Sequence, residues 1–301
     1  MTAVTPEPIL KVAMGFMAAK HLFVASEVGL FEALAAGPAT IEELASQTGV
    51  PSRTIAIATA AMVGLGFIEQ HGHHYQNGEQ VAAFLAGKPG PDLRPMLRFF
   101  DQISYPAWQK LADAVRTGNG QAQFGKFDKR QQKIFSAGVE SFSGPGAAAL
   151  KRHAKLRGTL FELPGPCAVA RQKLANLPEG SRIDIVEGDV FKDALPAGYD
   201  ALIVANTAHV FSVPHNIELL RKMRTGVQPG ARLLLVDLWT DLSHTQPTSA
   251  ALISGEFLVI SGEGQAYSEQ EADTWLRQTG WKKIEKTPLA GPTSLIVAEA
   301  V

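Results

Sequence analysis

Residues 159–191 read TLFELPGPCAVARQKLANLPEGSRIDIVEGDVF, and this stretch decides the fold of the C-terminal half of the chain. TLFEL and RIDIVEGDVF are predicted strands, and PCAVARQKLANL between them is a predicted helix. The alternation continues with YDALIVANTAHVF, PHNIELLRKMRTGV, ARLLLVDLW, EQEADTWLRQTGW, KKIEKTPL and SLIVAEA. Such alternation predicts an α/β domain with a doubly wound parallel sheet that binds its ligand at the carboxyl ends of the strands. The last two runs are expected to form an antiparallel hairpin on that sheet.

The N-terminal part of the sequence predicts a different, mostly helical domain. Residues 9–34 are apolar on almost every side and are followed by Gly37-Pro38, a helix-stop signal. A helix that is apolar all round must be buried, either within its own domain or against a second subunit. From Thr40 we expect a capped helix, a tight turn at Gly49-Val50-Pro51, a second helix and a short hairpin around His71. This is the layout of a winged helix-turn-helix.

Winged helices often bind DNA, but the charge of this one argues against it. Residues 40–88 hold two basic side chains against four acidic ones, whereas DNA binding depends on cations that neutralise phosphates. The whole chain carries a formal net charge of -1, so we expect no nucleic-acid partner. His71, His73 and His74 lie at the expected hairpin tip, and we interpret them as a solvated turn rather than a metal site.

The composition is that of a globular protein with two domains, because 46% of the 301 residues are hydrophobic and 19% are charged. Cys167 is the only cysteine, which excludes an internal disulfide and fits a reducing compartment. Lys11, Lys20 and His21 interrupt the apolar N-terminal stretch. We therefore expect neither a signal peptide nor a run of the ~20 apolar residues that a transmembrane helix needs. These features predict a cytoplasmic protein without a membrane partner.

Chemically useful side chains follow several predicted strands. Glu162 ends the first of them, where an acidic residue can accept hydrogen bonds from ribose hydroxyls. Asp189 and Phe191 end the next, where one can accept from an exocyclic amine and the other can lie against a purine face. Each has a structural interpretation by itself, as a capping carboxylate or a core aromatic. Their order along the sheet favours a nucleoside site.

His209 and Asp237 follow two further strands of the same sheet. An imidazole titrates near neutral pH, and a carboxylate within hydrogen-bond reach fixes its tautomer and orientation. Together they form the minimal arrangement of a general base. A lone histidine is more often structural, but the position at a strand end favours catalysis.

These motifs resemble those of the S-adenosylmethionine-dependent O-methyltransferases shared by plant phenolic-compound enzymes, acetylserotonin methyltransferase and bacterial relatives. VEGDVF resembles the family's Gly-Asp-x-Phe segment, and FELPG resembles its Phe-Asp-Leu-Pro, with Glu162 for the usual Asp. HVFSVPHNIELLRKM resembles its His-Asp-Trp-Ser segment, with Val210 for the Asp. The resemblance covers nearly the whole chain. It implies a winged-helix dimerisation domain over residues 1–90, a helical linker contributing to the active site over 91–150 and a Rossmann-like methyltransferase domain over 151–301.

The resemblance also implies a role for each matching residue and a homodimeric assembly. His209 would take the proton from the acceptor hydroxyl, and Asp237 would hold His209. Phe135 would lie near the acceptor, a small hydroxylated molecule of aromatic character. Glu256 and Glu263 are both candidates for a second acidic partner of the histidine. S-adenosylmethionine would be the cofactor, bound through Glu162, Gly188, Asp189, Phe191, Asn206 and Ser143.

One element that the family requires is not found. A first strand, an acidic glycine-rich turn and a helix should precede TLFEL, because the backbone there approaches the methionine part of the cofactor closely. Here SFSGPGAAA at 141–149 runs directly into LKRHAKLRG at 150–158, so about 20 to 35 residues are missing. Gly144-Pro145-Gly146 could be the loop itself, but no convincing strand precedes it and no acidic residue follows it. A sheet without this strand would leave unpaired backbone groups on both neighbouring strands.

We therefore predict an O-methyltransferase that acts on a small hydroxylated acceptor. The alternative is a shortened, catalytically silent homologue that retains dimerisation or partner binding. A DNA-binding regulator is the weakest hypothesis, because of the charge of the helical domain.

Overall fold

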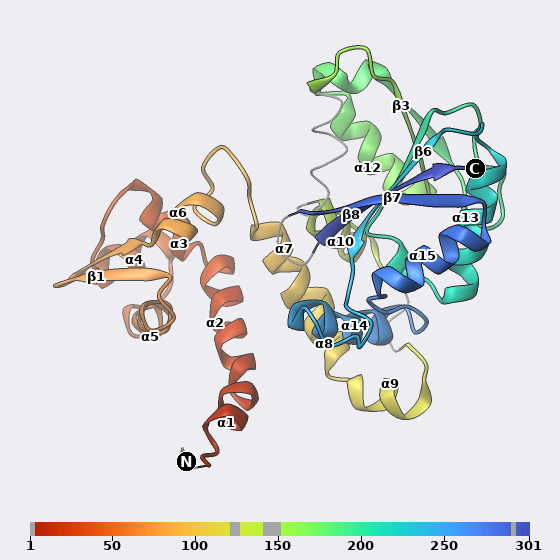
Figure 1. Cartoon of the computed structure of the whole chain (residues 1–301). Coiled ribbons are helices and arrows are strands. Elements are labelled where there is room, and N and C mark those ends of the chain that lie inside the picture. The colour runs from red at the N-terminus through yellow and green to blue at the C-terminus, as the bar shows by residue number, and fades with distance from the viewer. Residues whose placement is uncertain (1–3, 121–126, 141–151, 290–292) are drawn as a thin grey trace. The chain divides into compact units, whose positions relative to one another are not determined.

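The computed structural model describes residues 4–120, 127–140, 152–289 and 293–301, and the chain folds into two compact units (Figure 1). The first unit comprises residues 1–103 and 133–142. The second comprises residues 104–132 and 143–301. The segment expected as a linker, 91–150, is therefore divided between the two units.

The first unit is mostly helical. Its elements are α1 (Glu7–Ala13), α2 (Gly15–Glu27), α3 (Leu30–Ala33), η1 (Leu34–Ala36), α4 (Ile41–Thr48), α5 (Ser52–Gly64), β1 (Ile68–His71), β2 (His74–Asn77), α6 (Glu79–Phe84), α7 (Arg94–Phe99), most of the π-helical turn η2 (Phe100–Ser104) and most of α10 (Lys129–Glu140). The core is built from buried side chains of α3, α4 and α5, among them Phe31, Leu44 and Ile55. The expected single helix over residues 9–34 is thus broken into shorter helices.

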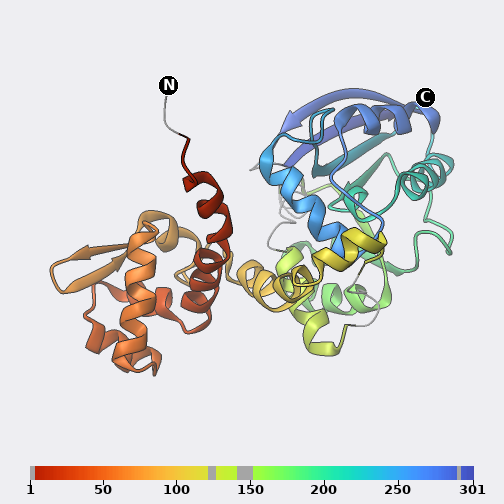
Figure 2. The ribbon, with the colours of Figure 1, turned by 90° about the horizontal axis from the view of Figure 1, so that it is seen from below.

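The helix, turn, helix and hairpin expected after Thr40 are all present. The Thr40 hydroxyl accepts from the backbone N–H of Glu43 at 3.3 Å, and the Glu43 carboxylate accepts from the Thr40 N–H at 2.7 Å, so a capping box starts α4. Gly49 ends α4 in the left-handed conformation. The antiparallel hairpin of β1 and β2 pairs His71 with His74 and projects from the helices (Figure 2). The His71 ring is exposed and lies 3.4 Å from the Glu69 carboxylate.

The expectation that no stretch reaches transmembrane length is wrong. The consecutive helices α1 and α2 form a 21-residue stretch, Glu7–Glu27, whose hydropathy of 1.4 suffices for a membrane span by length and composition alone. Its few charged residues lower the mean hydropathy less than its many Ile, Leu, Val, Met and Phe side chains raise it. Only 6% of its most apolar window is buried within the chain. A helix that is buried against a second subunit can have the same length and apolar composition as a transmembrane helix. These two properties alone therefore do not distinguish a subunit interface from a membrane span.

The second unit is the α/β domain. Its elements are α8 (Tyr105–Trp108), α9 (Leu111–Thr117), β3 (Gly158–Glu162), α12 (Pro164–Leu174), η4 (Pro178–Arg182), β4 (Ile183–Glu187), β5 (Ala201–Ala205), η5 (Ala208–Val210), α13 (Val213–Thr225), β6 (Arg232–Leu238), α14 (Thr248–Ile260), α15 (Glu269–Gln278), β7 (Trp281–Pro288) and β8 (Thr293–Ala300). The expected strands and helices form, and the last two strands pair as an antiparallel hairpin. β8 lies between β6 and β7 (Figure 1), so the sheet is mixed rather than wholly parallel. The helix α14 was not predicted.

The sheet of this unit is divided into two parts. β3 pairs in parallel with β4, while β5, β6, β8 and β7 form a separate four-stranded sheet in that order. Among the described residues, no strand pairs with the second edge of β3 or of β5. This division lies where the sequence analysis expected the missing first strand. Within the part of the chain that the structure describes, each of these two edges therefore presents backbone groups without a partner strand.

The helices α13 and α15 cover one face of the four-stranded sheet. The core there includes Leu220 from α13, Trp275 from α15 and Trp281 and Ile296 from the strands. The other face is less well covered, since the Ile203 side chain on β5 is 53% exposed. A doubly wound sheet is normally covered on both faces, and among the described residues this face is the less covered one at β5.

Candidate active site

The carboxyl ends of β5 and β6 bring His209 and Asp237 together, as the sequence predicted. His209 lies on η5, directly after β5, and Asp237 lies near the end of β6, the parallel neighbour of β5. The imidazole Nδ1 pairs with the Asp237 Oδ1 atom, and both side chains are buried. Because the carboxylate only accepts, it fixes the proton of the neutral ring on Nδ1 and leaves a lone pair on Nε2.

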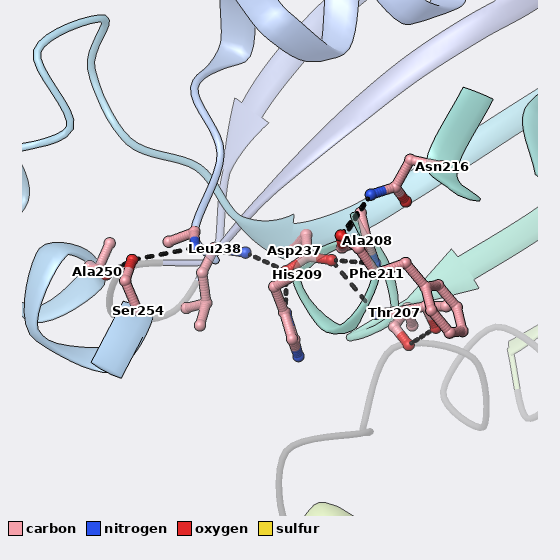
Figure 3. Close-up of polar contacts among 11 residues, drawn as sticks. Thr207, Ala208, His209, Phe211, Asn216, Asp237, Leu238, Ala250 and Ser254 are labelled. Atoms are coloured by element: carbon pink, nitrogen blue, oxygen red, sulfur yellow. Dashed lines mark hydrogen bonds and ion pairs between the residues drawn. The ribbon is translucent and has the colours of Figure 1, made fainter. Parts of the chain in front are cut away.

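The backbone fixes the Asp237 carboxylate in turn. Its Oδ2 atom accepts from the N–H of Ala208 at 2.9 Å and of Thr207 at 3.3 Å, and its Oδ1 atom accepts from the N–H of Leu238 at 2.7 Å. The close-up shows the second ring nitrogen of His209 pointing away from this carboxylate (Figure 3). These three backbone donors hold the carboxylate in one orientation. The pair can therefore accept a proton at Nε2 and stabilise the resulting imidazolium.

The unpredicted helix α14 forms one wall beside the base. The Phe257 ring stacks on the His209 imidazole, with centroids 4.0 Å apart and an interplanar angle of 21°. Gly264, in the loop after α14, packs so closely on the carbonyl of His209 that a Cβ atom would have no room. Sequence reasoning missed Phe257, because ALISGEFLVI is mostly apolar and gives no periodic signal that singles out one side chain.

Neither candidate for a second acidic partner contacts the imidazole of His209. Glu256 accepts from the Ser104 hydroxyl at 2.6 Å and from the Trp108 indole N–H, and burial raises the pKa of its carboxyl. Its other oxygen, Oε1, is buried without a hydrogen-bond partner among the described residues. Glu263 pairs instead with His215, on the first turn of α13. Asp237 is thus the one carboxylate that contacts the His209 ring among the described residues.

The residues expected to hold the adenosine lie at the carboxyl ends of β3, β4 and β5. Glu162 ends β3, and its Oε1 atom accepts from the N–H of Leu163 at 2.8 Å. Asp189 follows β4, and its two oxygens accept from the Phe191 N–H at 2.9 Å and from the Lys192 ammonium at 2.8 Å. The Lys192 ammonium lowers the pKa of this carboxyl. Asn206 follows β5 in the left-handed conformation, with φ 52°, which asparagine tolerates.

Gly188 lies at the same edge, directly after β4, where its N–H donates to the carbonyl of Glu162. The Phe161 ring packs on Gly188 so closely that a Cβ atom there would have no room. Phe135 belongs to the first unit, where its ring lies 5.8 Å from that of Phe99 in an edge-on arrangement. Ser143 and the Gly144–Gly146 segment lie outside the described residues. The roles of Phe135 and Ser143 therefore stay predictions.

The described residues fit the adenosine half of S-adenosylmethionine. A free oxygen of Glu162 suits the ribose, and the partly exposed Phe191 ring suits a purine face. Among the described ranges, no glycine-rich loop joins a strand to a helix ahead of β3, where the methionine half would lie. The chain's own residues thus account for the nucleoside, and the described ones supply no loop for the amino-acid part.

Comparison with known proteins agrees with this assignment. A model of the O-methyltransferase domain matches residues 135–282, and a model of the O-methyltransferase dimerisation domain matches residues 10–87. The 3-hydroxy-5-methyl-1-naphthoate 3-O-methyltransferase of Streptomyces sahachiroi is 30% identical, over 95% of this chain and 92% of that enzyme. Acetylserotonin O-methyltransferase of Mus musculus is 26% identical, over 96% of this chain and 87% of its own length. This chain belongs to the O-methyltransferase family, which confirms the resemblance.

Solved structures show the same fold. The human N-acetylserotonin methyltransferase in complex with SAM superposes with a TM-score of 0.87 at 23% identity, over 99% of both chains. The structure titled PigF with SAH has a TM-score of 0.81 at 25% identity, over 98% of this chain and all of that one. The predicted fold, enzyme class and cofactor, S-adenosylmethionine, are confirmed. The relatives are methyltransferases, so the alternative of a catalytically silent homologue finds no support.

The comparison also bears on the missing segment. The alignment with the Streptomyces enzyme spans 322 positions, whereas this chain has 301 residues. At least 21 aligned positions, the difference between these two numbers, therefore have no residue here. This agrees with the expected loss of a strand, a loop and much of a helix.

Proposed function

We propose that the chain methylates a hydroxyl group of a small aromatic acceptor, with His209 as the general base and Asp237 as the residue that holds it. The observation that carries the proposal is the buried His209–Asp237 pair, whose Nε2 atom has no hydrogen-bond partner among the described residues. The Phe257 ring stacks on the imidazole and supports its orientation. The relatives named for a naphthoate and for acetylserotonin support an aromatic acceptor.

The roles of the residues follow from their geometry. When bound, S-adenosylmethionine supplies an electrophilic methyl group on a positively charged sulfur. His209 accepts the proton of the acceptor hydroxyl at Nε2, so the oxygen becomes a better nucleophile. Asp237 keeps the ring in the required tautomer and stabilises the imidazolium. Glu162 binds the ribose, and Phe191 lies against the adenine, with Gly188 and Asn206 shaping the strand ends around the nucleoside.

The first test is methyl transfer by the purified chain. S-adenosylmethionine is incubated with a panel of hydroxynaphthalenes, and products are detected by the added mass of one methyl group. His209→Ala is expected to lower the rate about 100- to 10,000-fold, the usual contribution of a general base. Calorimetric titration with the cofactor and with S-adenosylhomocysteine tests binding separately. Absence of binding at millimolar concentration would refute the proposal.

In this proposal the first unit forms the contact between the two subunits of a homodimer. The dimerisation-domain match and the exposed apolar residues of α1 and α2 support a homodimer, with the winged-helix layout used for subunit contact rather than DNA. We assign residues 1–90 to the dimerisation domain, 91–150 to a linker and 151–301 to the methyltransferase domain. A cytoplasmic location is supported by Cys167, a free and buried thiol.

A further inference from the structure

The turn that carries His209 has few hydrogen bonds of its own. η5 contains three residues, and the N–H of Val210 donates to the carbonyl of Thr207 at 3.0 Å. The N–H of Phe211 lies 3.4 Å from the carbonyl of Ala208, which is longer than an ordinary hydrogen bond. Short 3₁₀ turns are weak by themselves. Side chains from other elements therefore determine how firmly His209 is held.

Asn216, on the first turn of α13, is one of these side chains. Its Nδ2 atom donates to the carbonyl of Ala208 at 2.8 Å and to that of Phe211 at 3.0 Å (Figure 3). Asn216 is 3% exposed, so water does not compete for these carbonyls. A single buried amide thus joins the first residue of η5 to the residue that follows the turn.

An amide is not what packing alone would favour at position 216. The other buried residues of α13 are Leu219 and Leu220. Asparagine is a weaker helix former than alanine or leucine, and a buried amide costs free energy unless it is hydrogen-bonded. The two hydrogen bonds to the turn therefore account for Asn216 better than its contribution to the core does.

The backbone of Ala208 is held from two sides. Its N–H donates to Oδ2 of Asp237 at 2.9 Å, and its carbonyl accepts from Asn216. That carbonyl belongs to the peptide bond that leads into His209, so its direction determines where the imidazole lies. Asn216 thus acts from α13 on the same ring that Asp237 contacts from β6.

We propose that Asn216 is a positioning residue for the general base. Its amide holds the turn so that Nδ1 of His209 stays paired with Asp237 and Nε2 stays available to the acceptor hydroxyl. Asn216 acts through the backbone and needs no contact with substrate or cofactor. The inference rests on the proposed function of His209, but the position of the imidazole can be measured without methyl transfer.

The experiment follows the Nδ1 proton of His209 by NMR in the full chain with isotope-labelled histidine. The signal is assigned by its loss in His209→Ala. In Asn216→Ala this proton should exchange with water at least about tenfold faster, because two buried hydrogen bonds that hold the turn are lost. The turnover number should fall at least about tenfold, whereas KM for S-adenosylmethionine should change less than about twofold.

Two control variants each remove one buried hydrogen bond nearby. Trp281→Phe removes the indole N–H that donates to the carbonyl of Leu220 on the same helix at 3.0 Å. Tyr267→Phe removes the phenol that donates to the carbonyl of Phe211 at 2.7 Å, and it leaves Ala208 untouched. Both should change the proton exchange and the turnover number less than about threefold. Circular dichroism confirms that each variant folds, and urea unfolding compares their stabilities.

Unchanged proton exchange in folded Asn216→Ala, or an equal acceleration in Trp281→Phe, would overturn the inference. A wild type whose Nδ1 proton exchanges too fast to be observed overturns it as well, because the pair is then not held.

If Asn216→Ala fails to fold, Asn216→Ser replaces it. A serine hydroxyl in a helix donates to the carbonyl four residues earlier, here that of Ser212, rather than to the turn. The same acceleration is expected, and its absence overturns the inference. A wild type without methyl transfer refutes the proposed function, while the comparison of proton exchange still decides whether Asn216 positions His209.

Discussion

The phenol of Tyr199 donates a 2.8 Å hydrogen bond to the hydroxyl of Thr159, and this contact joins the two parts of the divided sheet. Thr159 lies on β3, and Tyr199 precedes β5 by two residues. Among the residues described, neither β3 nor β5 has a strand paired with its second edge. A long aromatic side chain thus reaches across a region where a strand would otherwise supply backbone hydrogen bonds.

Tyr199→Phe is expected to lower the free energy of unfolding by about 1 kcal/mol, because a partly buried hydroxyl pair is lost. The effect should be local. Hydrogen exchange of β3 and β4 should accelerate more than that of β5 and β6, since the two-stranded sheet loses an anchor. Thr159→Val is the matched variant, and the double variant should cost little more than either single one. Uniform acceleration across all four strands would contradict this role.

The sequence predicted much of this architecture because each strand is a compact apolar run and each active-site residue follows one. His209 and Asp237 are 28 residues apart, but the carboxyl ends of adjacent parallel strands meet at one edge of a sheet. The strand expected before Thr159 was judged missing only through the family resemblance, which requires a strand and a glycine-rich turn there. Regularities of this kind predict the order and pairing of strands and helices, but not the contacts between side chains.

Contacts made by loops and by uniformly apolar helices were not predictable. The pairing of Glu263 with His215 joins a loop to a helix start, and no periodicity encodes it. Phe257 meets His209 through the orientation of α14, which a mostly apolar sequence without a clear period does not reveal. The hydroxyl pair of Tyr199 and Thr159 likewise depends on the distance between two strands, which sequence spacing does not give.

Asp237→Asn should lower the turnover number about 100- to 10,000-fold, because the amide no longer fixes the imidazole tautomer. Affinity for S-adenosylhomocysteine should change less than about twofold, since Asp237 is not among the nucleoside residues. The double variant with His209→Ala should be no slower than His209→Ala alone, because the two residues act as a unit. Steady-state kinetics and calorimetry measure both quantities. An additive loss would show that Asp237 acts independently of His209.

Glu256 should make stability depend on pH. Burial raises the pKa of its carboxyl in the folded chain above the ordinary value of 4.5, so the folded state holds the proton more tightly than the unfolded state. This contribution is complete below pH ~4.5 and is lost as the pH rises toward the folded pKa. Glu256→Gln keeps an oxygen that accepts from Ser104 and Trp108 but has no carboxyl to ionise, so its stability should not fall as the pH rises. At higher pH its free energy of unfolding should therefore exceed that of the wild type by about 1 kcal/mol.

Urea unfolding between pH 4 and 8 measures the difference between wild type and variant. Glu269→Gln is the control of opposite sign. Lys283 lowers the pKa of Glu269, so this carboxylate stabilises the folded chain above its unfolded pKa and ceases to do so as the pH falls. Parallel pH curves for the wild type and Glu256→Gln would contradict a raised pKa at Glu256.

The described site predicts an unusual pattern of ligand affinity. The groups proposed to bind the ligand, Glu162 and Phe191, would both contact its adenosine part. Adenosine should therefore bind within about tenfold of S-adenosylhomocysteine, because a tenfold ratio corresponds to only one additional hydrogen bond. Calorimetric titration of both ligands gives this ratio. A preference for S-adenosylhomocysteine above about a hundredfold would show that the chain also grips the amino-acid part.

Val12→Glu is expected to convert the proposed homodimer into a monomer. Val12 lies on α1 and is 81% exposed in the single chain, so a partner subunit would bury it, and a charge there would be desolvated without a counterion. Val115 on α9 is also apolar and 65% exposed, and Val115→Glu is the matched control that should stay dimeric. Light scattering after size-exclusion chromatography measures the masses. A monomeric wild type that floats with lipid vesicles would instead assign the apolar stretch Glu7–Glu27 to a membrane.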